Sequence, residues 1–193
     1  MIVSLNPGGR KTSQLSFQKD KENFRKGDFS PPQVISYWTR TDPRSMAIMV
    51  KDLYGQHIEL LKDQTVAFPV CFFRSRSWDE IPRPTRQRMR QFCFPIVNEI
   101  IQKLQPKRML VIGSRTRRYL DNDILGSKEV SAFNDPNLTI REGSRERLYE
   151  ESKWETEWGI IPILATIHLT GGHGISSEER RTLRERFHHW LGS

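Results

Sequence analysis

Two apolar segments of this sequence each run directly into a polar side chain with glycines behind it. Residues 2–5 precede Asn6, which is followed by Pro-Gly-Gly, and residues 159–167 precede His168, which is followed by a glycine-rich segment. Continuously apolar segments are typical of parallel strands that are buried on both faces. Because open α/β sheets bind ligands outside the carboxyl ends of their strands, Asn6 and His168 are predicted to lie in a ligand crevice.

The elements that would position these two residues alternate along the chain. Strands are expected at 2–5, 66–73, 109–112 and 159–167. Helices are expected over most of 34–54, over 85–104, and from Ser176 or Ser177 to about Leu191. Such alternation predicts a parallel sheet with helices on both faces. The expected fold class is therefore α/β, a three-layer α/β/α sandwich with a central, mostly parallel four-stranded sheet.

The domain organisation follows from length and local composition. A chain of 193 residues is sufficient for one domain with its own core, and we expect a single domain over 1–193. Residues 115–157 are charged and irregular in pattern, with a short apolar piece at 138–140 that would be an edge strand. A variable polar insert is therefore expected at about 114–157.

The charge balance indicates a polyanionic partner. Lys and Arg number 31 against 23 Asp and Glu, which gives a formal net charge of +8. A basic domain of this size is a candidate for a polyanionic partner, nucleic acid first and an acidic membrane second. Near the carboxyl end, arginines alternate with glutamates, which predicts an ordinary solvated helix face. These arginines are Arg180, Arg181, Arg184 and Arg186.

Cysteine usage and hydropathy indicate the remaining properties. Cys71 and Cys93 both lie in apolar stretches, which favours buried, reduced thiols and a cytoplasmic protein. The spacing of His and Cys matches no metal-site motif, and no metal and no cofactor are expected. No apolar run is long enough to cross a membrane, so no membrane partner is expected. We expect a monomer.

Several segments, in the right order, resemble the uracil-DNA glycosylase superfamily. Residues 3–8, Val-Ser-Leu-Asn-Pro-Gly, are similar to its first motif as the mismatch-specific branch carries it. Residues 15–17 resemble the segment that supplies an aromatic ring, and His168 with the small residues after it resembles the second motif. Three further segments resemble the middle of the same fold: residues 72–75 with Pro82, residues 93–95 and residues 104–113.

This resemblance implies a metal-free, monofunctional DNA glycosylase, which flips a base out of the helix and hydrolyses its N-glycosidic bond. Asn6 would orient the attacking water, and His168 would donate a hydrogen bond to the departing base as negative charge develops on it. Phe17 would stack on the flipped base, and Pro7 and Gly8 would line its pocket. The product would be an abasic site.

The loops on the crevice side of the predicted sheet supply the candidate DNA contacts. Basic side chains there would neutralise phosphates, and glycine-rich backbone permits close approach of a phosphate or sugar. Thr170 or Ser176 would take the phosphate contact of the serine that the second motif usually carries. Arg117 and Arg118 are expected on the same side. The predicted DNA-binding residues are Arg10, Lys11, Arg74, Arg76, Arg115, Thr170, Gly171, Gly172 and His173.

Two substrates and two other functions stay open. The superfamily often reads uracil with an asparagine after the second strand, whereas this chain has Pro69 or Cys71 there, and its second motif lacks the usual Pro and Ser. The base is therefore uracil, in base-excision repair, or a bulky modified cytosine such as glucosylated hydroxymethylcytosine of phage DNA, in antiviral defence. One alternative is a catalytically inactive DNA-binding module of the same fold. A doubly wound enzyme acting on nucleotides or sugar phosphates ranks last, because the chain lacks G-x-G-x-x-G and a P-loop.

Overall fold

The computed structural model describes residues 1–5, 46–73, 78–126, 130–132, 148–169 and 175–192. These residues form a six-stranded sheet in the order β2-β1-β3-β6-β5-β4. The strands are β1 (Ile2–Ser4), β2 (Ala67–Pro69), β3 (Met109–Ile112), β4 (Val130–Ala132), β5 (Tyr149–Thr156) and β6 (Gly159–Thr166). The helices are α3 (Met46–Tyr54), α4 (Ile58–Asp63), α5 (Arg83–Leu104), α6 (Ser114–Tyr119) and α7 (Ser177–Gly192), with short turns η1 (Gly55–His57) and η2 (Leu120–Ile124).

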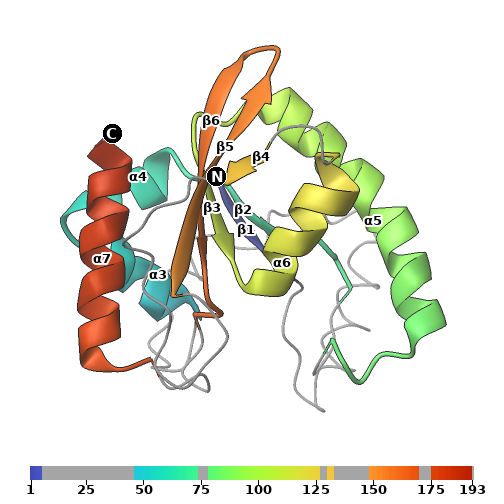
Figure 1. Ribbon diagram of the computed structural model, residues 1–193, viewed down its shortest axis with the longest axis horizontal. Helices are drawn as coiled ribbons and strands as arrows, with labels where there is room; N and C mark the ends of the chain where they lie inside the picture. Colours follow the sequence, from blue (N-terminus) through green and yellow to red (C-terminus); the bar gives the residue numbers. More distant parts are fainter. Residues whose placement is uncertain (6–45, 74–77, 127–129, 133–147, 170–174, 193) are drawn as a thin grey trace, which may run out of the picture.

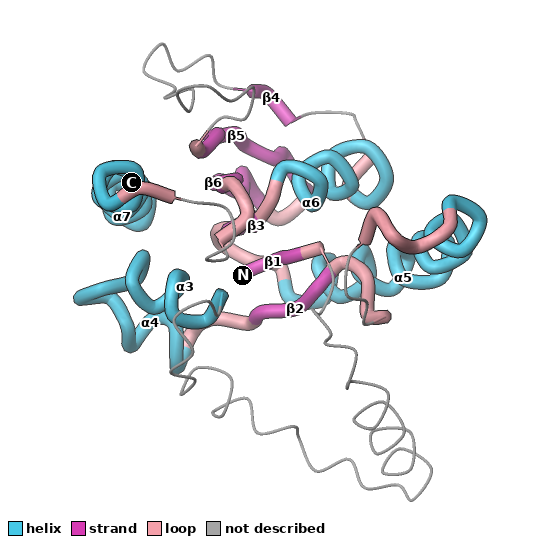
Figure 2. The backbone as a smooth tube through the Cα atoms, turned by 90° about the horizontal axis from the view of Figure 1, so that it is seen from below, coloured by secondary structure: helices cyan, strands magenta, loops and turns pink. Residues whose placement is uncertain are grey.

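Helices cover both faces of the sheet, which confirms the predicted three-layer α/β/α class (Figure 1). Seen along the strands, α3, α4 and α7 lie on one side of the sheet, and α5 and α6 lie on the other (Figure 2). Successive residues of β1 divide between the two layers, because side chains of a strand point alternately to opposite faces. Ile2 packs with the α3, α4 and α7 layer, whereas Val3 packs with α5 and α6.

The four predicted strands form the parallel part of the sheet. β1 pairs in parallel with β2 and with β3, and β3 pairs in parallel with β6. All four residues of β3 are buried, as expected for a central strand that is covered on both sides. The predicted strand at 66–73 is shorter in the structure, where β2 spans only Ala67–Pro69.

Two further strands correct the prediction of a four-stranded sheet. β5 pairs antiparallel with β6 across a tight hairpin, and β4 pairs antiparallel with β5. The sequence concealed β5 because all six of its residues other than the two buried aromatic ones, Tyr149 and Trp154, are charged or hydroxylic. Its register follows from the hairpin with β6, which no local periodicity reveals.

The polar insert expected at about 114–157 is therefore structured over much of its described length. It contains α6, η2, β4 and β5, so the expectation of irregular structure is wrong for these residues. η2 is a π-helical turn that continues α6. The apolar piece at 138–140, predicted as an edge strand, lies outside the described residues.

The predicted helix boundaries agree closely with the structure. α5 begins at Arg83 with Pro84 in its first turn, where a missing amide hydrogen costs nothing. It ends at Leu104, and Gln105 after it adopts the left-handed conformation. α7 begins with a capping box: the amide of Ser176 donates to Glu179 Oε2 (2.7 Å), and the amide of Glu179 donates to Ser176 Oγ (3.1 Å). Of the helix predicted within 34–54, α3 confirms the part from Met46 onward.

The two cysteines are buried, as predicted. Cys71 and Cys93 are free thiols with their sulfur atoms 4.0 Å apart, packed in the core under α5. Burial raises the pKa of the Cys71 thiol to about 11, so it stays protonated and behaves as a small apolar side chain.

Within the described ranges, no helix is both long enough and apolar enough to span a membrane.

Candidate functional site at the carboxyl edge of the sheet

The chain reverses its direction of winding between β1 and β3. Among the described elements, α3 and α4, which lie between β1 and β2 in the sequence, cover one face of the sheet, whereas α6, which follows β3, covers the other face. Adjacent parallel strands whose connections leave to opposite faces open a crevice at their carboxyl ends. This switch point coincides with the edge at which the sequence predicted a ligand site.

The carboxyl end of β1 is held firmly against the segment that follows β2. The amide of Val70 donates to the carbonyl of Ser4 (2.7 Å), and the amide of Cys71 donates to the carbonyl of Leu5 (2.9 Å). Leu5, the residue before Asn6 in the sequence, therefore ends at the switch point with its backbone fixed.

His168 lies at the same edge, just beyond β6 and beside the turn from β3 into α6. The turn is fixed because the amide of Gly113 donates to the carbonyl of Thr166 (2.8 Å). Gly113 has a φ of +94°, which favours glycine, and a Cβ atom there would lie 3.6 Å from His168 Cδ2. The imidazole is thus half-buried against a glycine turn, one strand away from the switch point.

Of the residues predicted to act in catalysis, to bind the base or to bind DNA, His168 and Arg115 belong to the described part of the chain, and both lie at the carboxyl edge. The others lie outside the described residues: Asn6, Pro7, Gly8, Arg10, Lys11, Phe17, Arg74, Arg76, Thr170, Gly171, Gly172 and His173.

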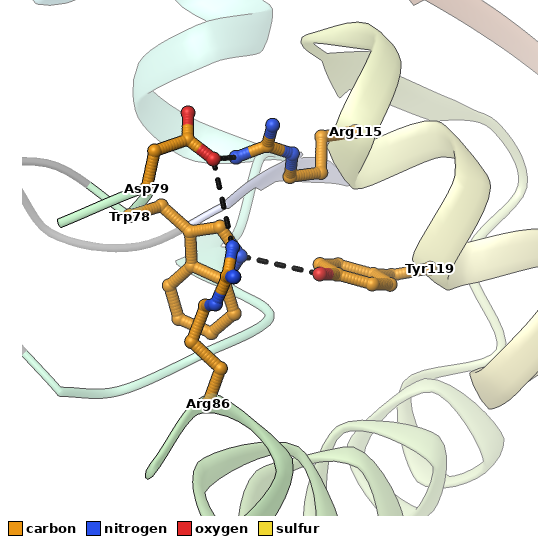
Figure 3. A network of polar contacts seen from close by, with 5 residues as sticks. All are labelled: Trp78, Asp79, Arg86, Arg115 and Tyr119. Carbon is orange, nitrogen blue, oxygen red and sulfur yellow. Dashed lines mark hydrogen bonds and ion pairs between the residues drawn. The ribbon is translucent and has the colours of Figure 1, made fainter. Parts of the chain in front are cut away.

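Arg115 belongs to a polar cluster that links three segments (Figure 3). Asp79 Oδ1 lies 2.6 Å from Arg115 Nη1 at the start of α6 and 3.5 Å from Arg86 Nη1 near the start of α5. Beside this cluster, Trp78 Nε1 donates to the hydroxyl of Tyr119 (3.2 Å). One carboxylate thus faces two guanidinium groups, so these three side chains together are positively charged.

A second basic feature, the α5–α6 pocket, was not predicted from the sequence. It has a volume of about 780 Å³ and is lined by Arg83, Arg86, Gln87, Arg90, Gln91, Phe94, Pro95, Tyr119 and Asp123. A signal was present, since residues 83–90 contain four arginines at helical spacings that bring three of them to one face. The other side of the pocket is formed by α6 and η2, and nothing in the sequence indicates that these elements pack beside α5.

Arg117 is not available to a ligand, contrary to the expectation for it. Its side chain is only 8% exposed, and its Nη1 lies 2.6 Å from Asp121 Oδ1. Burial lowers the pKa of Arg117 and raises the pKa of Asp121 to about 6, an increase that Arg117 opposes and Glu150 of β5 reinforces. This perturbed pair belongs to the packing of α6 and η2 rather than to the crevice.

No protein-family model matches this chain, and no curated protein is significantly similar to it. Its function is therefore inferred from its residues and their geometry. Among the described residues, no group of three or more His, Cys, Asp or Glu side chains is arranged to hold a metal ion.

Proposed function

We propose that this protein is a monofunctional DNA glycosylase of the uracil-DNA glycosylase superfamily, which removes a pyrimidine-derived base and leaves an abasic site. The observation that supports it best is the position of His168. It stands against the Gly113 turn at the carboxyl edge of the parallel strands, beside the switch point at which β1 leads into Asn6. An open α/β sheet binds its ligand at this point.

The chemistry requires a base outside the stack, stabilisation of the departing charge and a water molecule directed at the sugar carbon. His168 can donate a hydrogen bond to the base oxygen on which negative charge develops. Its half-buried position favours this role, because a donor that is shielded from water stabilises charge more strongly than an exposed one. Asn6, which follows the fixed end of β1, would orient the water.

DNA is the polyanion that the charge distribution favours. The chain carries a net charge of +8, and Arg115 and Arg86 share a single aspartate at the corner beside the switch point. Guanidinium groups in such a position attract the phosphates that flank an extruded nucleotide.

The segment after β2 bears on the choice of base. Cys71 is fully buried and Pro69 has no side-chain amide, so neither of them reads the edge of a uracil. A pocket with few side chains that hydrogen-bond to the edge of the base accepts bulkier bases. This favours a modified cytosine, such as the glucosylated hydroxymethylcytosine of phage DNA, as the substrate. Antiviral defence would follow from that substrate, and base-excision repair from uracil.

The test is a glycosylase assay on two panels, oligonucleotides with uracil or mismatched thymine and modified phage DNA, followed by heating in alkali to break abasic sites. His168→Ala is expected to slow excision by about 10²–10³-fold, the usual cost of one donor to a developing negative charge. Asn6→Ala, added to His168→Ala, is expected to abolish most of the activity that the single variant retains. His189→Ala, an exposed histidine on α7, is the matched control and should leave the rate unchanged.

The alternative is a DNA-binding module of the same fold without chemistry, which the missing Pro and Ser of the second motif favour. Cleavage that disappears with His168→Ala and Asn6→Ala would exclude it. Tight DNA binding with no abasic product on either panel would establish it and refute the glycosylase.

A further inference from the structure

The α5–α6 pocket lies beside the crevice and carries more positive than negative charge. Three arginines line it, and Asp123 is the one acidic residue among its described lining residues. Arg90 is matched, because its Nη2 lies 2.7 Å from Asp123 Oδ1. Arg83 is exposed and makes no ion pair with another described residue.

Arg90 is held in a fixed orientation. Its guanidinium lies 4.7 Å from the centre of the Tyr119 ring and 5.5 Å from that of Phe94. Stacking on aromatic faces and pairing with a carboxylate restrict a side chain that is otherwise flexible. Arg90 occupies one face of each ring, so a nucleobase cannot stack on that face.

The hydroxyl of Tyr119 contributes a hydrogen-bond donor. It accepts from Trp78 Nε1, and because the indole is a donor only, the proton of the phenol must point elsewhere. Together with the amides of Gln87 and Gln91, this group gives the pocket neutral donors beside its arginines. Such a set suits phosphate oxygens.

The helix dipole does not stabilise the first arginines of α5. Arg83 and Arg86 lie in the first turn of the helix, which contains no acidic residue. Positive side chains near the amino end of a helix interact unfavourably with the helix dipole. An anion in the pocket would offset that interaction.

Ion pairs connect the pocket with the carboxyl edge of the sheet. Asp79 joins Arg115, at that edge, to Arg86, which lines the pocket (Figure 3). A polyanion that occupies the crevice therefore meets further cations along α5. The volume of about 780 Å³ also exceeds what one phosphate group fills.

We propose that the α5–α6 pocket binds the phosphodiester backbone of DNA that extends beyond the crevice. This inference rests on the proposed function for the identity of the ligand. It gives the protein a second DNA-contact surface, which binds the phosphate backbone and makes no contact with the bases. Arg83, Arg86 and the Tyr119 hydroxyl contact phosphate oxygens, and Arg90 is fixed beside them by Tyr119 and Phe94.

Two charge reversals on the same helix test it. Arg83→Glu changes a residue that lines the pocket, whereas Arg88→Glu changes an exposed arginine of α5 that does not. Both alter the net charge equally. Affinity is measured by fluorescence anisotropy with an undamaged duplex of about three helical turns, between about 50 and 200 mM salt, and thermal melting checks that both variants fold.

Arg83→Glu is expected to weaken binding about tenfold and to reduce the salt dependence by the equivalent of about one phosphate contact, with a change of less than about twofold for Arg88→Glu. Equal effects of the two variants would refute DNA binding by the pocket and would leave the glycosylase proposal intact. Absence of DNA binding by the parent protein, with binding of inorganic phosphate or a nucleoside monophosphate that Arg83→Glu removes, would also overturn it. Base excision, measured separately, decides the proposed function in either case.

Discussion

The two long helices on opposite faces of the sheet are both rich in arginine, yet their arginines have different partners. On α7, three arginines face carboxylates one to one: Arg181 with Glu178, Arg184 with Asp52, and Arg186 with Glu151. On α5, Arg86 shares Asp79 with Arg115, and Arg90 pairs with Asp123. Arg83 and Arg88 have no ion pair with a described residue. The same residue type thus stabilises the fold on one face and supplies positive charge on the other.

The partners of α7 correct the prediction of an ordinary solvated face. Arg186 binds both carboxylate oxygens of Glu151 on β5, and its guanidinium lies 5.8 Å from the centre of the Tyr149 ring. Arg184 reaches Asp52 on α3 (3.3 Å). These pairs connect α7 to elements distant in sequence, so its arginines contribute to tertiary structure as well as to solubility.

The largest difference between the two helices should appear when an aromatic side chain is removed. Phe187 of α7 is fully buried, with its ring 4.8 Å from that of Tyr54 and 5.6 Å from that of Trp190. Phe187→Ala is expected to lower the free energy of unfolding by about 3–5 kcal/mol, because a large cavity remains. Phe92→Ala on α5, where the ring is 60% exposed, should have little effect. Urea denaturation measures both, and similar losses would contradict the difference in burial between the two rings.

A smaller effect is expected for the bidentate ion pair. Arg186→Ala should lower the free energy of unfolding by about 1–3 kcal/mol, because it leaves the partly buried carboxylate of Glu151 without its charged donor. Arg181→Ala, which removes an exposed pair within the same helix, is the control and should leave stability almost unchanged. Equal losses for the two variants would show that the contact with β5 adds nothing.

The buried pair beneath α6 predicts a pH dependence. The pKa of Asp121 is raised from 3.8 to about 6, so the folded protein binds this proton more tightly than the unfolded chain does. Its contribution to stability is therefore present at low pH and is lost as the pH rises between about 4 and 6. The parent protein should lose about 1–2 kcal/mol of unfolding free energy across that window, with allowance for solvent screening. Asp121→Asn should remove this loss and so flatten the plot of unfolding free energy against pH. Asp123→Asn is the control, and an unchanged slope in Asp121→Asn would refute the shift.

The smallest effect is expected on α5. Arg83→Ala should change the free energy of unfolding by less than about 0.5 kcal/mol, because the side chain is exposed and unpaired among the described residues. The same variant should weaken DNA binding if the α5–α6 pocket holds phosphates. A loss of stability comparable with that of Arg186→Ala would instead make Arg83 a structural residue, and the contrast between the two helices would disappear.

The predictable parts of this fold are those with a strong local signal. β3 and β6 are continuous apolar runs, and α5 shows helical periodicity over 22 residues, so their types and limits follow from sequence. β5 could not be predicted, since its partner β6 determines its register and its charged residues conceal the two buried rings. At the site, the predicted edge position of His168 is confirmed, while Asp79 and Arg86 were missed because ion pairs between segments leave no mark in local sequence.

The sequence by itself determined the α/β class, the parallel strands and the edge at which His168 lies, because apolar runs and caps act over a few neighbouring residues. Only the tertiary structure decided which arginines are matched by carboxylates, that Arg117 is buried against Asp121, and that α5 and α6 enclose a pocket. Those outcomes depend on which helix packs beside which strand. The free energy of a charged side chain depends on its burial and on the charges beside it, and both are set by the tertiary structure.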